Sequence, residues 1–262
     1  MENKDEEQIE VLVGKIIKEE YEVVGLQEIN QLINSSSIIT DKYFQATNNQ
    51  QTVHEDNFLY RLIQRLNELG HYYYWSWTFN HIGYEKYQEG VGLLSKVPFD
   101  KVESLLISKT SNPTDYHTRK VMIGELTIAN RTVIVVSGHF SWWKDQAFYF
   151  EWKKLEQRLI IETKDLIVLG DFNNDAKIKE EGYDLIKNSP LQLQDAFKEA
   201  KKITGEYTVE KSIDGWVGNL SKLRIDYIFT SKSFLVRNYK IVFNDKNETK
   251  ISDHYGVEVE VG

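Results

Sequence analysis

A cluster of carboxylates and amides follows a short apolar run in the second half of the chain. Residues 166–169 read Leu-Ile-Val-Leu, a pattern typical of a strand buried on both faces. The run ends at Gly170, and four oxygen-bearing side chains follow: Asp171, Asn173, Asn174 and Asp175. Such side chains would lie at one rim of a sheet, where α/β folds place ligands, and their oxygens suit a hard cation such as Mg²⁺. A polar turn remains the commoner explanation of Gly170-Asp171 taken alone.

Other expected strand ends carry groups of the same kind. Residues 21–26 read as a strand that leads into Glu28, and residues 131–136 as a strand that leads to His139. Taken alone, Glu28 is more often a surface or helix-start acid, and a lone histidine is usually structural or exposed. The order in which these groups occur along the chain is nevertheless specific as a set.

The last third of the chain adds an acid and an acid–histidine pair. Asp226 falls inside an expected strand at 222–229, where a buried carboxylate needs a partner because it is costly without one. Asp253 and His254 directly precede an alternating run at 255–261 that reads as a strand. His254 can therefore lie at a strand end, as Glu28, His139 and Asp171 do.

Composition narrows the class of protein. The 262 residues have a formal net charge of −8, which argues against binding nucleic acid through a basic stripe. A bound divalent cation could still supply the local positive charge that a phosphate substrate needs. The chain has no cysteine, so disulfides and thiolate metal sites are excluded. No apolar run approaches the roughly 20 residues of a membrane span, and no signal peptide is recognisable. We therefore expect a cytoplasmic protein with no transmembrane segment.

The elements that must position these groups follow from hydrophobic periodicity. No repeat, low-complexity tract or linker interrupts the chain, so we expect one domain over residues 1–262. Residues 31–53 are polar and read as a long loop, and the aromatic stretch 71–87 is expected to be partly strand core and partly pocket wall. Helices are expected at 5–20, 58–69, 146–163, 183–188 and 194–202, and further strands at 90–95, 102–107, 120–128 and 235–243.

Five short motifs in this order resemble the endonuclease/exonuclease/phosphatase superfamily, whose members include deoxyribonuclease I. The motifs are Leu26-Gln27-Glu28, Ser137-Gly138-His139, Gly170-Asp171-Phe172-Asn173, Ile225-Asp226-Tyr227-Ile228 and Ser252-Asp253-His254. The resemblance covers residues 27–254. It implies a four-layer α/β sandwich, with two mixed β-sheets packed face to face, helices on the outer faces and a site at one end.

The resemblance also implies a role for each residue. Glu28 corresponds to the residue that binds Mg²⁺, and Mn²⁺ could take the place of Mg²⁺. Asp253 corresponds to an ancillary ligand of the metal or of a water molecule. His254, oriented by Asp226, corresponds to the residue that activates water or stabilises the phosphoryl group. Asp171 and Asn173 correspond to the pair that positions the nucleophile and the phosphate. His139 corresponds to a residue that donates a hydrogen bond to a phosphate oxygen. The chemistry is consistent, because a cation must neutralise an anionic ester and a histidine beside an acid is held in one tautomer.

One feature departs from the family pattern. Members normally begin with a strand that carries an Asn beside the metal, ahead of the first helix. Here the first expected helix follows Met1 almost at once, so we expect that strand and its Asn to be missing. An interior strand that is lost exposes sheet edges and removes a site amide.

The substrate does not follow from the fold. We expect a monomeric, metal-dependent phosphoesterase that acts on a small or lipid-derived phosphoester by water attack, with Arg119, Trp142 and Tyr84 as substrate-binding residues. A nuclease is the alternative, because aromatic side chains can stack bases and Arg119 could meet a phosphate backbone. A non-catalytic binding protein with an incomplete site is a third hypothesis, supported only by the missing strand.

Overall fold

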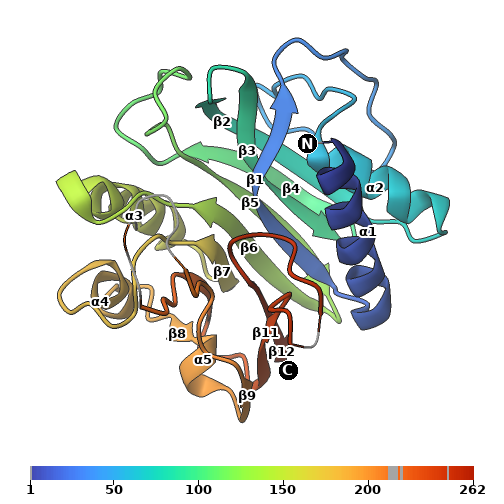
Figure 1. The fold of residues 1–262 in the computed structure, drawn as a ribbon. Helices are drawn as coiled ribbons and strands as arrows, with labels where there is room; N and C mark the ends of the chain where they lie inside the picture. Colours follow the sequence, from blue (N-terminus) through green and yellow to red (C-terminus); the bar gives the residue numbers. More distant parts are fainter. Residues whose placement is uncertain (1, 212–217, 219–220, 247) are drawn as a thin grey trace. The chain divides into compact units, whose positions relative to one another are not determined.

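The computed structural model describes residues 2–211, 218, 221–246 and 248–262, and it divides into two compact units. The first unit comprises residues 1–139 and the second residues 140–262 (Figure 1). Among the described residues, no helix is both long and apolar enough to cross a membrane.

The first unit combines two helices with two antiparallel groups of strands. Its strands are ordered β1-β3-β2 and β4-β5-β6. The elements are α1 (Glu2–Glu19), β1 (Val23–Leu32), α2 (Phe58–Glu68), β2 (Tyr74–Gly83), β3 (Tyr87–Ser95), β4 (Phe99–Leu106), β5 (Lys120–Ile128) and β6 (Arg131–His139). The first described element is α1, which begins at Glu2.

Both helices of this unit form because their apolar residues recur at helical spacing. The stripe on α1 buries Ile9, Leu12, Val13 and Ile16. Helix α2 begins after Asn57, whose side chain accepts a hydrogen bond from the backbone N–H of Tyr60. The two helices pack on each other (Figure 1). The ion pair between Arg65 Nε and Glu10 Oε1, at 2.6 Å, joins their exposed sides.

The two groups of strands in the first unit pack face to face. Trp75 and Trp77 of β2 are fully buried, so this part of the aromatic stretch is strand core as expected, whereas Tyr72 and Tyr84 are exposed. The packing is close at Gly124 of β5, where a Cβ atom would lie 2.7 Å from the Phe99 ring of neighbouring β4 and 3.2 Å from the Leu93 side chain of β3 in the other group. A side chain larger than hydrogen does not fit there.

Central strand β3 is flanked by two β-bulges at the same level. In β1 the pairing shifts between Leu26 and Ile29, and in β2 it shifts between Phe79 and His81. Ile29 and Phe79 both pair with Gly90 of β3. Bulges re-aim side chains and are frequent beside active sites.

The second unit contains the remaining elements. Its strands are ordered β7-β10-β8, all antiparallel, and β12-β11-β9, in which β11 and β9 are parallel. The elements are the 3-10 helix η1 (Lys144–Gln146), α3 (Ala147–Leu159), β7 (Asp165–Asp171), α4 (Gly182–Lys187), β8 (Gln194–Asp195), α5 (Ala196–Glu199), β9 (Lys202–Thr204), β10 (Asp226–Thr230), β11 (Val236–Val242) and β12 (Gly256–Val261). Ala196, Ile228, Val236, Tyr239 and Ile241 form one hydrophobic core cluster of this unit.

Two sequence predictions in the second unit are wrong in their bounds. The expected helix at 194–202 is only the short α5, because residues 194–195 form β8 beside β10 and Asp195 then caps the helix through Phe197 N–H. The expected strand at 222–229 begins only at Asp226, so Asp226 is the first residue of β10 and does not lie inside a strand. The expected α/β fold class is otherwise confirmed, with several sheets and helices packed on them.

Candidate active site

In the second unit, His254, Asp226 and Asp171 form one compact group. His254 Nδ1 lies 3.0 Å from both carboxylate oxygens of Asp226, and His254 Nε2 lies 4.0 Å from Asp171 Oδ2. Asp226 and Asp171 are direct cross-strand partners in the antiparallel pair β10–β7, so their side chains project from the same face. The partner that the Asp226 carboxylate needs is therefore His254.

The turn after β7 fixes Asp171 and Asn173. Gly170 has a φ of +138°, a conformation that favours glycine, and it precedes Asp171 directly. The backbone of Asn173 adopts the left-handed conformation, with a φ of +50°. Its N–H donates a hydrogen bond to Asp171 Oδ1 at 2.8 Å. Its side-chain amide donates to the Phe140 carbonyl at 2.9 Å. Non-glycine residues in this conformation occur often at functional sites, where the surrounding contacts hold them.

Thr208 links the two segments that supply Asp226 and His254. Its side chain is fully buried, and its Oγ1 accepts hydrogen bonds from the backbone N–H groups of Ile225, at 3.2 Å, and Asp226, at 3.3 Å. Its carbonyl accepts the N–H of Tyr255, the residue after His254, at 2.7 Å. Thr208 therefore sets where the Asp226 and His254 backbones lie relative to each other.

The charges around His254 keep its imidazole protonated. Burial alone would lower the pKa of His254, but the carboxylates of Asp226 and Asp171 outweigh burial and raise the pKa to about 11. Asp253 adds to the rise, although its own side chain is exposed. In the absence of a metal ion, the group therefore presents a positive imidazolium held between two acids.

In the first unit, three nitrogen atoms converge on one carboxylate oxygen. Glu89 Oε1 lies 3.7 Å from His81 Nε2, 3.8 Å from Arg119 Nη1 and 3.8 Å from His139 Nδ1. His81, Arg119 and His139 are all buried. They come from β2, from the residue before β5 and from the end of β6, so three strand ends meet at Glu89 of β3.

Glu28 lies in the bulge of β1, next to this cluster. It is exposed and left-handed, with a φ of +55°. Burial, and then the negative charge of Glu28, raises the pKa of Glu89 to about 7. Two carboxylates that repel each other in this way favour a cation.

The predicted substrate-binding residues lie in different surroundings. Arg119 is buried beside Glu89, whereas Tyr84 is 79% exposed in the turn between β2 and β3. Trp142 of the second unit is half-buried, and its indole N–H has no hydrogen-bond partner among the described residues.

Sequence reasoning missed Glu89, His81 and Thr208. Glu89 stands next to the short segment Gly90–Gly92, which the sequence analysis read only as a strand. Gly90 was the available signal: a Cβ atom there would lie 2.0 Å from the Thr78 carbonyl oxygen, so the backbones approach closely beside Glu89. His81 was missed because it lies within the aromatic stretch 71–87, which was interpreted only as strand core and pocket wall.

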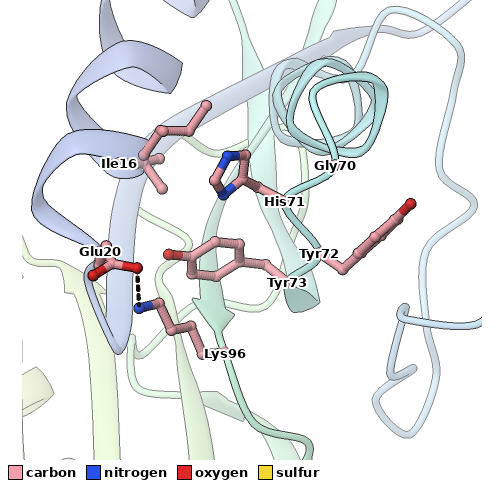
Figure 2. Close-up of a pocket in the computed structure, with 8 residues that line it drawn as sticks. Ile16, Glu20, Gly70, His71, Tyr72, Tyr73 and Lys96 are labelled. Carbon is pink, nitrogen blue, oxygen red and sulfur yellow. Dashed lines mark ion pairs between the residues drawn. The ribbon is translucent and has the colours of Figure 1, made fainter.

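A small cavity in the first unit lies away from Glu89. Figure 2 shows it between α1, the segment Gly70–Tyr73 and Lys96, with a volume of about 260 Å³. The ion pair between Lys96 Nζ and Glu20 Oε1, at 3.9 Å, lies at its edge. Lys96 follows β3 directly, so the cavity is roughly 20 Å along that strand from Glu89. It is not part of the groups described above.

The donor atoms at both groups fit a divalent cation. Asp171, Asp226 and His254 each offer one ligand atom, and these atoms lie within 4.8 Å of one another. Glu28 and Glu89 supply further carboxylate oxygens in the first unit. Oxygen-rich groups of this kind suit Mg²⁺ or Mn²⁺.

An α/β fold whose strand ends present acids, an amide and histidines defines the deoxyribonuclease I-like class. The chain belongs to the Endonuclease/Exonuclease/phosphatase family, because the sequence pattern of that family matches residues 3–254. Members of this family are hydrolases that act on phosphoesters; they include phosphatases and nucleases and generally depend on a divalent metal. The predicted family is thereby confirmed.

Solved structures agree with this assignment. A family protein from Leptotrichia buccalis is 28% identical, with a TM-score of 0.85 over 100% of this chain and 95% of that one. A mannosyl-6-phosphatase from Bacteroides thetaiotaomicron is 16% identical, with a TM-score of 0.67 over 98% and 91% of the two chains. The human Nocturnin catalytic domain, solved with a sulfate anion, is 18% identical, with a TM-score of 0.65 over 98% and 86%. No match is found among curated proteins.

Proposed function

We propose that the chain is a metal-dependent hydrolase of a small or lipid-derived phosphoester, with one catalytic domain over its whole length. The observation that carries the proposal is the contact of His254 with both oxygens of Asp226, beside Asp171. Family membership over residues 3–254 supports a single domain.

The proposed roles follow from the charges and contacts. Asp226 holds the His254 ring in place, and the protonated imidazole stabilises the phosphoryl oxygens or donates a proton to the leaving group. Asp171, which Asn173 N–H fixes, positions the attacking water, and the Asn173 amide binds the phosphate. His139 and Arg119 supply further donors to phosphate oxygens.

We assign Glu28 as the metal ligand, with Asp253 as an ancillary ligand. When bound, Mg²⁺ or Mn²⁺ neutralises the negative charge of the ester. The exposed position of Glu28 in a bulge, beside the acid Glu89, supports this assignment.

The substrate class is tested by Mg²⁺-dependent hydrolysis of bis-p-nitrophenyl phosphate, an inositol phosphate, sphingomyelin and plasmid DNA. We expect turnover of a small or lipid-derived ester and weak activity on DNA, because the net charge of −8 opposes binding to a polyanion. Preferred cleavage of DNA, with binding that weakens steeply as salt increases, would establish the nuclease instead. Mg²⁺ binding without turnover of any ester would establish a binding protein.

A further inference from the structure

We propose that His81 is a positioning residue: by sharing the Glu89 carboxylate, it keeps the Arg119 guanidinium open to a phosphate oxygen. The inference rests on the proposed function for the identity of the ligand. It starts from one atom, Glu89 Oε1, which His81 Nε2 approaches to 3.7 Å and Arg119 Nη1 to 3.8 Å.

The backbone places His81 against Glu89. The two residues are direct cross-strand partners in β2 and β3, immediately after the bulge at Asn80. On the other side of β3, Glu89 pairs with Asn30 of β1. A row of three polar side chains therefore crosses the sheet on one face, with the acid in the centre.

Arg119 lies against this row with unused donors. Its side chain is 5% exposed, and its Nε and Nη1 groups have no hydrogen-bond partner among the described residues. The 3.8 Å separation from Glu89 is too long for a hydrogen bond. A buried guanidinium in this state lacks acceptors, and the oxygens of a phosphate match its planar array of donors.

His81 can hold Glu89 without competing for the anion. Its Nε2 makes a polar contact with Glu89 Oε1 at 3.7 Å, which is too long for a hydrogen bond, as the contact from Arg119 Nη1 at 3.8 Å is. The two side chains therefore share the charge of one carboxylate oxygen, and neither holds it in a close pair. Without this ring, Glu89 is free to close on Arg119 as a full ion pair and occupy the donors that a phosphate needs.

The test compares three variants with the wild-type protein, with inorganic phosphate as the probe. His81→Leu removes the donor, His81→Gln keeps a donor near the Nε2 position, and His54→Leu removes another buried histidine of the same unit, which contacts the Leu32 carbonyl instead. By calorimetry on metal-free protein, we expect His81→Leu to weaken phosphate binding about tenfold, roughly the effect of one charge-assisted hydrogen bond. His81→Gln and His54→Leu should bind like the wild type.

Kinetics with bis-p-nitrophenyl phosphate provide a second readout. We expect His81→Leu to raise KM about tenfold and to change kcat by less than about twofold, because the loss is in binding. Wild-type phosphate binding in His81→Leu, or an equal loss in His81→Gln or His54→Leu, would overturn the proposal.

A double-mutant cycle shows whether His81 acts through Glu89. In a Glu89→Gln background the acid that could capture Arg119 is gone, so His81→Leu should no longer weaken phosphate binding. Additive effects would overturn the proposal. If His81→Leu folds poorly, Glu89→Gln alone decides the case: it should bind phosphate at least as tightly as the wild type, and weaker binding would overturn the proposal. Because phosphate binding needs no turnover, a protein that hydrolyses no ester would refute the proposed function and leave this measurement to decide the role of His81.

Discussion

His254 Nδ1 lies 3.0 Å from each carboxylate oxygen of Asp226, and Asp226 in turn is the cross-strand partner of Asp171. The position of the histidine is thus tied to the register of β7 and β10. A shift of that register by one residue would turn Asp226 to the opposite face and separate the pair.

The first prediction concerns the chemical step. His254→Ala should lower kcat by about 10²–10⁴-fold, the range for loss of a positioned acid or base. Mg²⁺ affinity should fall far less, because Glu28 is the proposed ligand. Steady-state kinetics and Mg²⁺ titration measure the two effects, and His117→Ala, which removes a histidine half exposed at the surface, is the control. Turnover at the wild-type rate in His254→Ala would refute the assigned role.

The second prediction concerns stability against pH in metal-free protein. The pKa of His254 is raised from 6.5 to about 11 in the folded state, so the stabilising contribution is fully present below pH 6.5. It should be lost progressively as the pH rises from 6.5 to about 11, because the unfolded chain releases that proton first. Urea unfolding across this range should show a slope that His254→Gln reduces. An unchanged slope in the variant would contradict the raised pKa of His254.

Thr208 provides a third prediction. Thr208→Val leaves two backbone N–H groups without their acceptor, and each buried unsatisfied group costs about 1–3 kcal/mol. The free energy of unfolding should fall accordingly, and kcat should fall with it because Asp226 is no longer fixed. Thr208→Ser keeps the hydroxyl and should restore both. If Thr208→Val retains the wild-type kcat, Thr208 does not position the pair.

Close approach of the backbone at Gly90 gives a fourth prediction. A Cβ atom at Gly90 would lie 2.0 Å from the Thr78 carbonyl oxygen, whereas one at Gly14 in α1 meets nothing within 4 Å. Gly90→Ala should therefore destabilise the protein by more than about 2 kcal/mol. Gly14→Ala should stabilise it by about 0.5–1 kcal/mol, because glycine is unfavourable in a helix. Thermal unfolding of both variants measures the contrast, and equal effects would contradict the packing at β3.

The sequence predicted the parts of the fold that depend on periodicity. The stripe of Ile9, Leu12, Val13 and Ile16 determines α1, and the apolar run before Gly170 determines β7. The short α5 was not predictable in this way, because the pairing of residues 194–195 with β10 takes precedence over local helix preference.

The candidate site was predictable where a polar residue stands at a strand end. Asp171 and His139 are the last residues of β7 and β6, and His254 lies two residues before β12. The prediction that Glu28 stands at a strand end is wrong, because β1 continues to Leu32 and Glu28 lies in its bulge. The order of the motifs gave the family. Glu89 and His81 were not predictable, because they meet across two strands at a bulge, and a bulge changes which face a side chain occupies. Thr208 acts through backbone groups that leave no pattern in the sequence.

The most direct test of the central claim is hydrolysis of bis-p-nitrophenyl phosphate in water labelled with oxygen-18, with Mg²⁺ and with a chelator. The account predicts that the label enters the phosphoryl product, that release requires Mg²⁺ and that Asp226→Asn nearly abolishes it. Oxygen-18 in the released p-nitrophenol would contradict water attack at phosphorus. Release of p-nitrophenol that neither the chelator nor Asp226→Asn reduces would contradict metal-dependent hydrolysis by this site.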